Sequence, residues 1–257
     1  MSTILTGHVG TVELLDLEVI SEFYGRDFLP YPFMFTRPGR FATQDEAAAY
    51  ERTVPDRFKN GDLSVFVECM AAYVDADIRV EAHVQYLPAD TPSVRLIAWR
   101  TGMFGFFAEQ LPDSDAIEIH TVSPYDLGEA VCDHLPLDQA GRHPRIVVPE
   151  YAPRAVADFD FDDFGIRDRS GASPDITIDE RDVVAYATVQ SHWRPTRRWG
   201  PDFGKSGAVW LQVEGDGEYL YTPDFSHARP MTRASLRERI DQLIAADVEI
   251  LQDFLRD

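Results

Sequence analysis

Three aspartates at alternate positions, Asp158, Asp160 and Asp162, are the first residues whose types and spacing could do chemistry. Carboxylates in this pattern direct oxygen atoms at one hard cation such as Ca²⁺. The rest of a calcium loop is missing, because Asp163 stands where the turn glycine belongs and Arg169 where the bidentate glutamate belongs. We therefore expect a solvated, acidic and aromatic linker here and no bound metal.

A second candidate is the stretch Gly200-Pro-Asp-Phe-Gly-Lys-Ser206, which looks like a phosphate-binding loop. That motif needs four residues between its glycines and this stretch has three. It is followed by the strand-like Val209–Val213, whereas bound phosphate needs a helix N-terminus at that point. The pattern indicates the loop of a hairpin.

The remaining reactive side chains form no motif. Seven histidines are spread along the chain without the spacing of metal ligands, and there is no Gly-x-Ser-x-Gly nucleophile elbow. The two cysteines, Cys69 and Cys132, lie in apolar stretches typical of reduced, buried thiols. From these patterns we expect no catalytic residue, no cofactor and no metal.

The formal net charge of −20 over 257 residues opposes binding to nucleic acid and to anionic membranes. A cluster with suitable residue types does exist, since Arg194, Arg197 and Arg198 lie beside Trp193 and Trp199. Given the overall charge, the pattern favours a solvated loop or pairing with the chain's own acids. We expect neutral or basic partners, and neither nucleic acid nor a membrane.

The N-terminal stretch has no Lys or Arg before Arg26, so it lacks the shape of a signal peptide. No window approaches the roughly 18 apolar residues of a membrane span. The expected location is the cytoplasm.

Hydrophobic periodicity predicts an α+β fold. Helices are expected after Thr11 to near Gly25, from the capping box at Thr43 to about Val54, and near 63–73. Four strands follow, beginning with Ile78–Tyr86, which is expected to have one wet face, and a helix opens at Ser123-Pro124. The remaining strands are predicted at 94–100, 104–109 and 116–122.

The second half repeats this order. It comprises a strand over 183–193, a hairpin over 208–214 and 218–222, and a helix from Thr232. We interpret the chain as one domain, 1–257, whose related halves (about 1–136 and 175–257) are joined by a connector, 137–174.

Alternation in the second half leaves an aromatic and amide surface with almost no charge. Taking Val183, Ala185, Ala187, Val189, Val209, Leu211, Val213 and Leu220 as the buried face places Tyr186, Thr188, Gln190, His192, Trp210, Gln212, Tyr219 and Tyr221 on the other. Such a composition suits protein recognition. The competing interpretation is that another part of the chain covers this face. The closing helix is longer than one sheet needs, so Ile250 and Phe254 are expected to be partly uncovered.

The order of these features resembles the EspG family, the cytosolic chaperones of type VII (ESX) secretion in mycobacteria and related actinobacteria. The resemblance rests on five features. They are Leu29-Pro-Tyr-Pro-Phe33, the strand block after Asp77, the helix ending at Leu135-Pro136, the phrase Arg145-Ile-Val-Val-Pro149, and the hairpin Trp210–Tyr219.

The resemblance implies a quasi-two-fold arrangement around a central antiparallel sheet, flanked by helical bundles. It also implies a non-enzymatic adaptor that binds the hydrophobic helical tip of a PPE protein within a PE–PPE heterodimer and keeps it soluble. Glu218, where relatives often carry Arg, and the short loops 88–92 and 101–104 depart from the family pattern. The alternative function is a small-molecule-binding α+β protein or hydrolase, with a pocket between sheet and closing helix and a constellation around His83 or His120.

Overall fold

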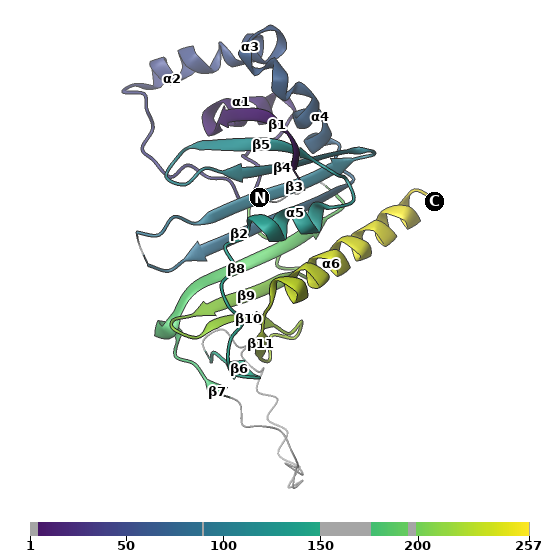
Figure 1. The fold of residues 1–257 in the computed structure, drawn as a ribbon. Helices are drawn as coiled ribbons and strands as arrows, with labels where there is room; N and C mark the ends of the chain where they lie inside the picture. Colours follow the sequence, from purple (N-terminus) through teal and green to yellow (C-terminus); the bar gives the residue numbers. More distant parts are fainter. Residues whose placement is uncertain (1–4, 89, 150–175, 195–198, 257) are drawn as a thin grey trace, which may run out of the picture.

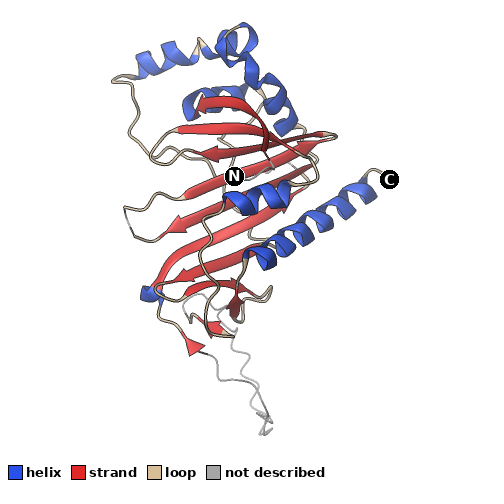
Figure 2. Ribbon diagram, viewed as in Figure 1, coloured by secondary structure: helices blue, strands red, loops and turns tan. Residues whose placement is uncertain are grey.

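The computed structural model describes residues 5–88, 90–149, 176–194 and 199–256. They form an α+β structure around a single eleven-stranded sheet (Figure 2). In spatial order the strands are β1 (Leu5–Glu13), β5 (Ala116–Val122), β4 (Phe104–Gln110), β3 (Val94–Thr101), β2 (Ile78–Tyr86), β8 (Val183–His192), β9 (Ala208–Val213), β10 (Gly217–Tyr221), β11 (Ala228–Pro230), β6 (Ile146–Val147) and β7 (Ile176–Thr177). The neighbours pair antiparallel except β6 and β7, which are parallel.

Two helices cover one face of the sheet. These are α5 (Leu127–His134) and α6 (Arg233–Phe254), which cross the sheet side by side in Figure 1. Their apolar side chains, such as Val131, Leu236 and Ile240, pack on alternate residues of the central strands, including Val80 and Val189. Thr232 caps α6, as its position predicts, by accepting a hydrogen bond from the Ser235 amide at 3.1 Å.

The other face of the N-terminal half carries a second helical layer (Figure 1). It consists of α1 (Leu14–Phe23), α2 (Gln44–Glu51), α3 (Val54–Asn60), the 3₁₀ turn η1 (Asp62–Phe66) and α4 (Val67–Val74). Leu17, Phe58 and Met70 from this layer share a core with Trp99 and Phe106 of the sheet. A third, smaller core lies on this face in the C-terminal half of the sheet, around Leu211, Tyr219 and Ile146. The 3₁₀ turn η2 (Glu180–Asp182) directly precedes β8.

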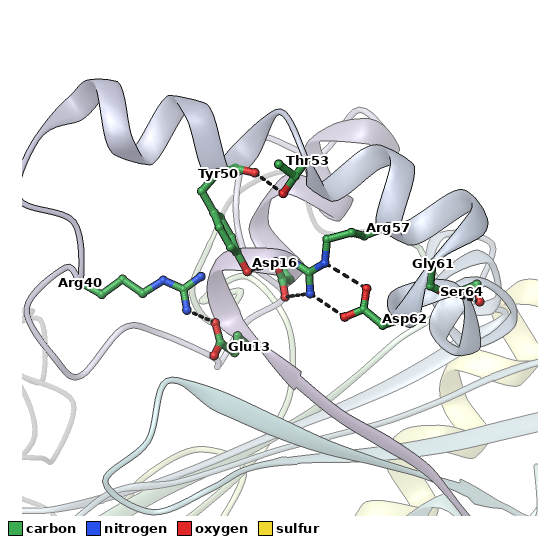
Figure 3. A network of polar contacts seen from close by, with 9 residues as sticks. All are labelled: Glu13, Asp16, Arg40, Tyr50, Thr53, Arg57, Gly61, Asp62 and Ser64. Carbon is green, nitrogen blue, oxygen red and sulfur yellow. Dashed lines mark hydrogen bonds and ion pairs between the residues drawn. The ribbon is translucent and has the colours of Figure 1, made fainter.

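Figure 3 shows the polar network that joins α1 to α2 and α3. Asp16, which is 3% exposed, accepts from the Tyr50 hydroxyl at 2.7 Å and from Arg57 at 3.1 Å. Arg57 also binds Asp62, and this contact holds the pKa of Asp62 below its usual value. Because its charges pair with one another, the network holds the helical layer together and leaves no free acid or base for chemistry.

The predicted helices and strands are found with small shifts at their ends, whereas α3 and the short strands β6, β7 and β11 were not predicted. Two further differences matter. β1 was not predicted, because its Gly, Thr and His residues give weak alternation; pairing with β5 stabilises it. The helix expected from Ser123 begins at Leu127, because Ser123 accepts the Asp126 amide at 3.1 Å and closes a turn instead.

The strand order is symmetrical about the β2–β8 pair. On one side the order is β2, β3, β4, β5 and on the other β8, β9, β10, β11, and each series is followed in sequence by a helix, α5 or α6. The duplication of the halves stays a prediction, as do the flanking bundles: the described helices form one layer of short helices and one pair. Asp158 to Asp162 and most of the connector lie outside the described residues.

Candidate functional site

A hollow of about 950 Å³ lies on the sheet face opposite α6, where the N- and C-terminal halves meet. Its floor includes Tyr186, Thr188 and Gln190 of β8, and His83 of β2, which pairs with Thr188. These residues share one face because they alternate along adjacent, in-register strands. The site is therefore built on rigid sheet and is walled by loops.

Two loops that are far apart in sequence form the walls. The segment 199–207, between β8 and β9, is held by Gln190, whose amide donates to the carbonyls of Asp202 and Lys205 at 2.8 and 3.1 Å and accepts from the Asp202 amide at 2.8 Å. The Trp199 indole donates to the Phe33 carbonyl at 3.1 Å. The second loop, after α1, thereby closes the opposite wall.

The same 199–207 segment reaches the other side of the sheet. Lys205 pairs with Asp247 of α6 at 2.5 Å, and Asp247 is only 1% exposed. Trp193 and Arg194, which precede the segment, stack against Phe254 near the end of α6. The wall of the hollow and the closing helix are thus physically connected.

The rim of the hollow is apolar and open to solvent. Phe203 is 88% exposed, Trp199 42% and Met34 38%. Large apolar side chains are seldom gathered at one exposed place unless they contact something. This rim, Met34, Trp199 and Phe203, surrounds a floor that is polar.

The titratable groups of the floor are neutral or basic. Burial, and then the charge of Arg95, lower the pKa of His83 to about 4, so its imidazole is neutral at pH 7. Burial raises the pKa of Tyr31, against a smaller lowering by its hydrogen bond with Thr188, and burial also raises that of Tyr186. The hollow can offer hydrogen bonds and one buried cation, Arg95, to a ligand.

A comparison with protein-family models matches residues 13–242 to the EspG family. The chain belongs to the EspG family. None of the curated proteins compared with it matches. Among solved structures, the Mycobacterium tuberculosis type VII secretion system chaperone EspG5, in complex with the PE25–PPE41 dimer, is similar at a TM-score of 0.46 and 11% identity, over 91% of this chain and 94% of that chain.

The structure of this EspG-family chain divides the eight predicted site residues into three groups. Tyr186, Thr188 and Gln190 line the hollow. His192, Tyr219 and Tyr221 share that face but are buried, at 5%, 0% and 8% exposure. Trp210 and Gln212 lie on the opposite face, where Trp210 packs in the α6 core at 2% exposure.

The prediction that Trp210 faces outward is wrong because both faces of β9 carry apolar residues. Trp210 pairs with Ala187 beneath α6, while Leu211 pairs with Tyr186 on the hollow side. A β-bulge adds to the difference, since an extra β8 residue between Val183 and Ala185 places these two residues in different cores. The alternation of side chains between the two faces of the sheet is therefore interrupted in β8.

The wet face expected for β2 is found only toward the end of the strand, where His83 and Gln85 line the hollow, and the prediction is wrong for its first half. Arg79 and Glu81 are 3% and 2% exposed, since the neighbouring loop and α4 cover them. Arg79 donates to the Arg194 carbonyl at 2.8 Å and lies over the Tyr73 ring, and Glu81 lies 3.3 Å from His192. These buried charges explain why His192, one of the predicted site residues, is not available to a partner.

Sequence reasoning missed most of the hollow, including Tyr31, Met34, Arg95, Trp199 and Phe203. A signal was present. Two long loops rich in aromatic residues, around Tyr31 and Phe203, were interpreted as connections, although loops of this length and composition often carry function. Arg95 gave no signal, because a single arginine in a strand is ordinary.

The histidines of the alternative hydrolase hypothesis do not meet. His83 lies in the hollow, whereas His120 lies on the opposite face, 3.7 Å from Glu118, which also binds His8 at 3.1 Å. Across the described ranges no group of three or more His, Cys, Asp or Glu side chains could hold a metal ion. Cys69 and Cys132 are free and buried, as predicted, and burial raises the pKa of each thiol to about 12. None of the described helices has the length and apolar character needed to cross a membrane.

Proposed function

We propose that this EspG-family chain is a chaperone of type VII secretion that binds the hydrophobic helical tip of a PPE-type protein in a PE–PPE heterodimer and keeps it soluble in the cytoplasm. Membership in the EspG family supports this function. The observation that carries the site assignment is the exposed aromatic rim around a preformed hollow. We propose that Tyr186 and Thr188 supply hydrogen bonds to the partner on the floor of the hollow. Five other predicted site residues are not proposed as partner contacts, because they are buried or lie on the α6 face: Trp210, Gln212, Tyr219, Tyr221 and His192.

The rim suits an apolar partner on energetic grounds. Phe203 is 88% exposed, so covering its ring removes most of its apolar surface from water, at about 25 cal/mol per Å². The residues below it are already ordered by Gln190 and the Lys205–Asp247 pair, which reduces the entropy lost on association. Binding of this kind makes or breaks no covalent bond.

The uncovered end of α6 extends the proposed surface. Ile250 is 47% exposed and Phe254 57%, as expected from the sequence, and Phe254 contacts Trp193 just before the loop that walls the hollow. We infer that a helical tip seated on the rim also contacts this end of α6. The symmetrical strand order about β2 and β8 supports the further inference that the two halves form one domain by duplication, with a quasi-two-fold relation.

The test is co-expression with the PE–PPE pairs encoded in the genome that encodes the chain, followed by titration calorimetry with each pair that co-purifies. Phe203→Ala is expected to weaken binding by about tenfold or more, as is usual for an exposed aromatic anchor. Phe23→Ala is the matched control, since Phe23 is 67% exposed at the end of α1, away from the hollow. Failure of every pair to bind the unaltered chain overturns the function, and equal affinities for the two variants overturn the site.

A further inference from the structure

The hollow has a local charge opposite to that of the molecule. The chain carries 44 acidic against 24 basic residues, yet the described residues that line the hollow include three cations, Arg95, Lys205 and Arg239, and one acid, Asp202. Lys205 is neutralised by Asp247. In the part of the chain that the structure describes, Arg239 makes one long contact, to the Gly207 carbonyl at 3.4 Å. A partly uncompensated positive site in so acidic a protein attracts an anion.

Arg95 is the cation that most lacks a partner. It is 8% exposed, and within the described ranges its guanidinium has a single weak hydrogen bond, to the Ser93 carbonyl at 3.4 Å, and no carboxylate within ion-pair distance. Its Nε atom is buried without an acceptor. Burying an unpaired charge is costly, so an anion bound to Arg95 would offset part of this cost.

The groups beside Arg95 are suited to hydrogen bonding with an anion. Among the described residues the Nε2 of His83 is buried without a partner, and the neutral ring lies edge-on to Tyr31. Arginine presents a planar pair of N–H groups that matches the two oxygens of a carboxylate. One such fork, with few other cations, fits a monoanion better than a phosphate.

The remaining wall fits an apolar chain. Trp199, Phe203 and Phe225 line the hollow, and its volume of about 950 Å³ falls within the range of small-molecule sites, roughly 300–1,000 Å³. We propose that the hollow binds a monocarboxylate with an apolar tail, whose carboxylate pairs with Arg95 and whose tail lies along these aromatic rings. This site goes beyond the proposed chaperone function and does not rest on it.

The test is calorimetric titration of the purified chain with decanoate, and with decan-1-ol as the neutral ligand of equal chain length. Decanoate is expected to bind, and decanol at least tenfold more weakly, because a hydrogen bond to a charged group accounts for a factor of this size. Arg95→Met should weaken decanoate to the level of decanol, and Arg95→Lys should restore part of the difference. Arg181→Met is the control, because Arg181 is exposed on η2 outside the hollow and its replacement changes the net charge by the same amount. It should leave the affinity for decanoate unchanged.

Several outcomes would overturn the proposal. They are absence of binding to the unaltered chain at millimolar decanoate, equal affinity for decanol, or unchanged affinity in Arg95→Met. Should Arg95→Met not fold by circular dichroism, Val209→Trp narrows the hollow without altering Arg95 and must also abolish binding. Because PE–PPE binding is measured separately, failure of one proposal is distinguishable from failure of the other.

Discussion

Replacing Glu218 with Gln is expected to stabilise the protein at alkaline pH and to have little effect near pH 4.5. Glu218 is 3% exposed on the α6 side of β10, and its Oε1 accepts a hydrogen bond from the Asp138 amide at 3.2 Å. Its pKa is raised from 4.5 to about 7, chiefly by burial; the Asp138 charge adds to the rise, and the hydrogen bond from the Asp138 amide and the charge of Arg233 oppose it. Glutamine keeps the shape and the acceptor while removing the charge.

The sign follows from proton linkage. Between pH 4.5 and 7 the folded state holds a proton that the unfolded chain has lost, so the free energy of unfolding falls as pH rises through this window. The contribution from Glu218 is complete below pH 4.5 and lost above pH 7. The full interval corresponds to about 3 kcal/mol, at about 1.4 kcal/mol per pH unit. Between about pH 5.5 and 8.5 the part lost is about 2 kcal/mol.

Urea unfolding followed by circular dichroism at several pH values in that range measures this difference. The stability of Glu218→Gln minus that of the unaltered protein should grow with pH by about 2 kcal/mol. Glu249→Gln, exposed on α6, makes the same change in net charge and should give a flat difference within about 0.5 kcal/mol. A pH-independent difference for Glu218→Gln, or one that shrinks as pH rises, would refute the reasoning.

Three further substitutions test other parts of the fold by the same urea assay. Trp210→Ala should cost about 3–5 kcal/mol, because it empties a core site beneath α6; a cost below about 1 kcal/mol would place Trp210 at the surface. Arg57→Ala should cost about 3 kcal/mol by leaving Asp16 buried without a cation, and Asp16→Asn in the same chain should recover part of it. Gly141→Ala should destabilise strongly, since a Cβ there would lie 2.0 Å from the Tyr219 ring; a neutral result would contradict this packing.

The sequence allowed the elements to be predicted where one periodicity dominates. β2 was predicted at its observed ends, α1 lies within the stretch that its apolar spacing indicates, and α6 begins at its predicted cap, Thr232. Alternation cannot decide which face is covered when both faces are apolar, which is why Trp210 was placed on the wrong side. The error in β2 was the opposite one. Its charged residues predicted a solvent-exposed face, but segments that are distant in the sequence bury them.

The candidate site was predictable only in part. Tyr186, Thr188 and Gln190 follow from the strand pattern, but the rim comes from loops whose positions depend on contacts between distant segments, such as Trp199 with the Phe33 carbonyl. The role of Gln190 also differs from the expectation. Its amide is fully engaged in holding the loop, so it shapes the hollow and has no free group for a partner.

The Lys205–Asp247 pair has a practical consequence for anyone who labels this protein. The chain has two lysines, and the amine of Lys205 is engaged by a carboxylate that is 1% exposed, whereas Lys59 is exposed in α3. An amine-reactive dye or surface should therefore attach to the N-terminal layer at Lys59, and leave the hollow facing the solution.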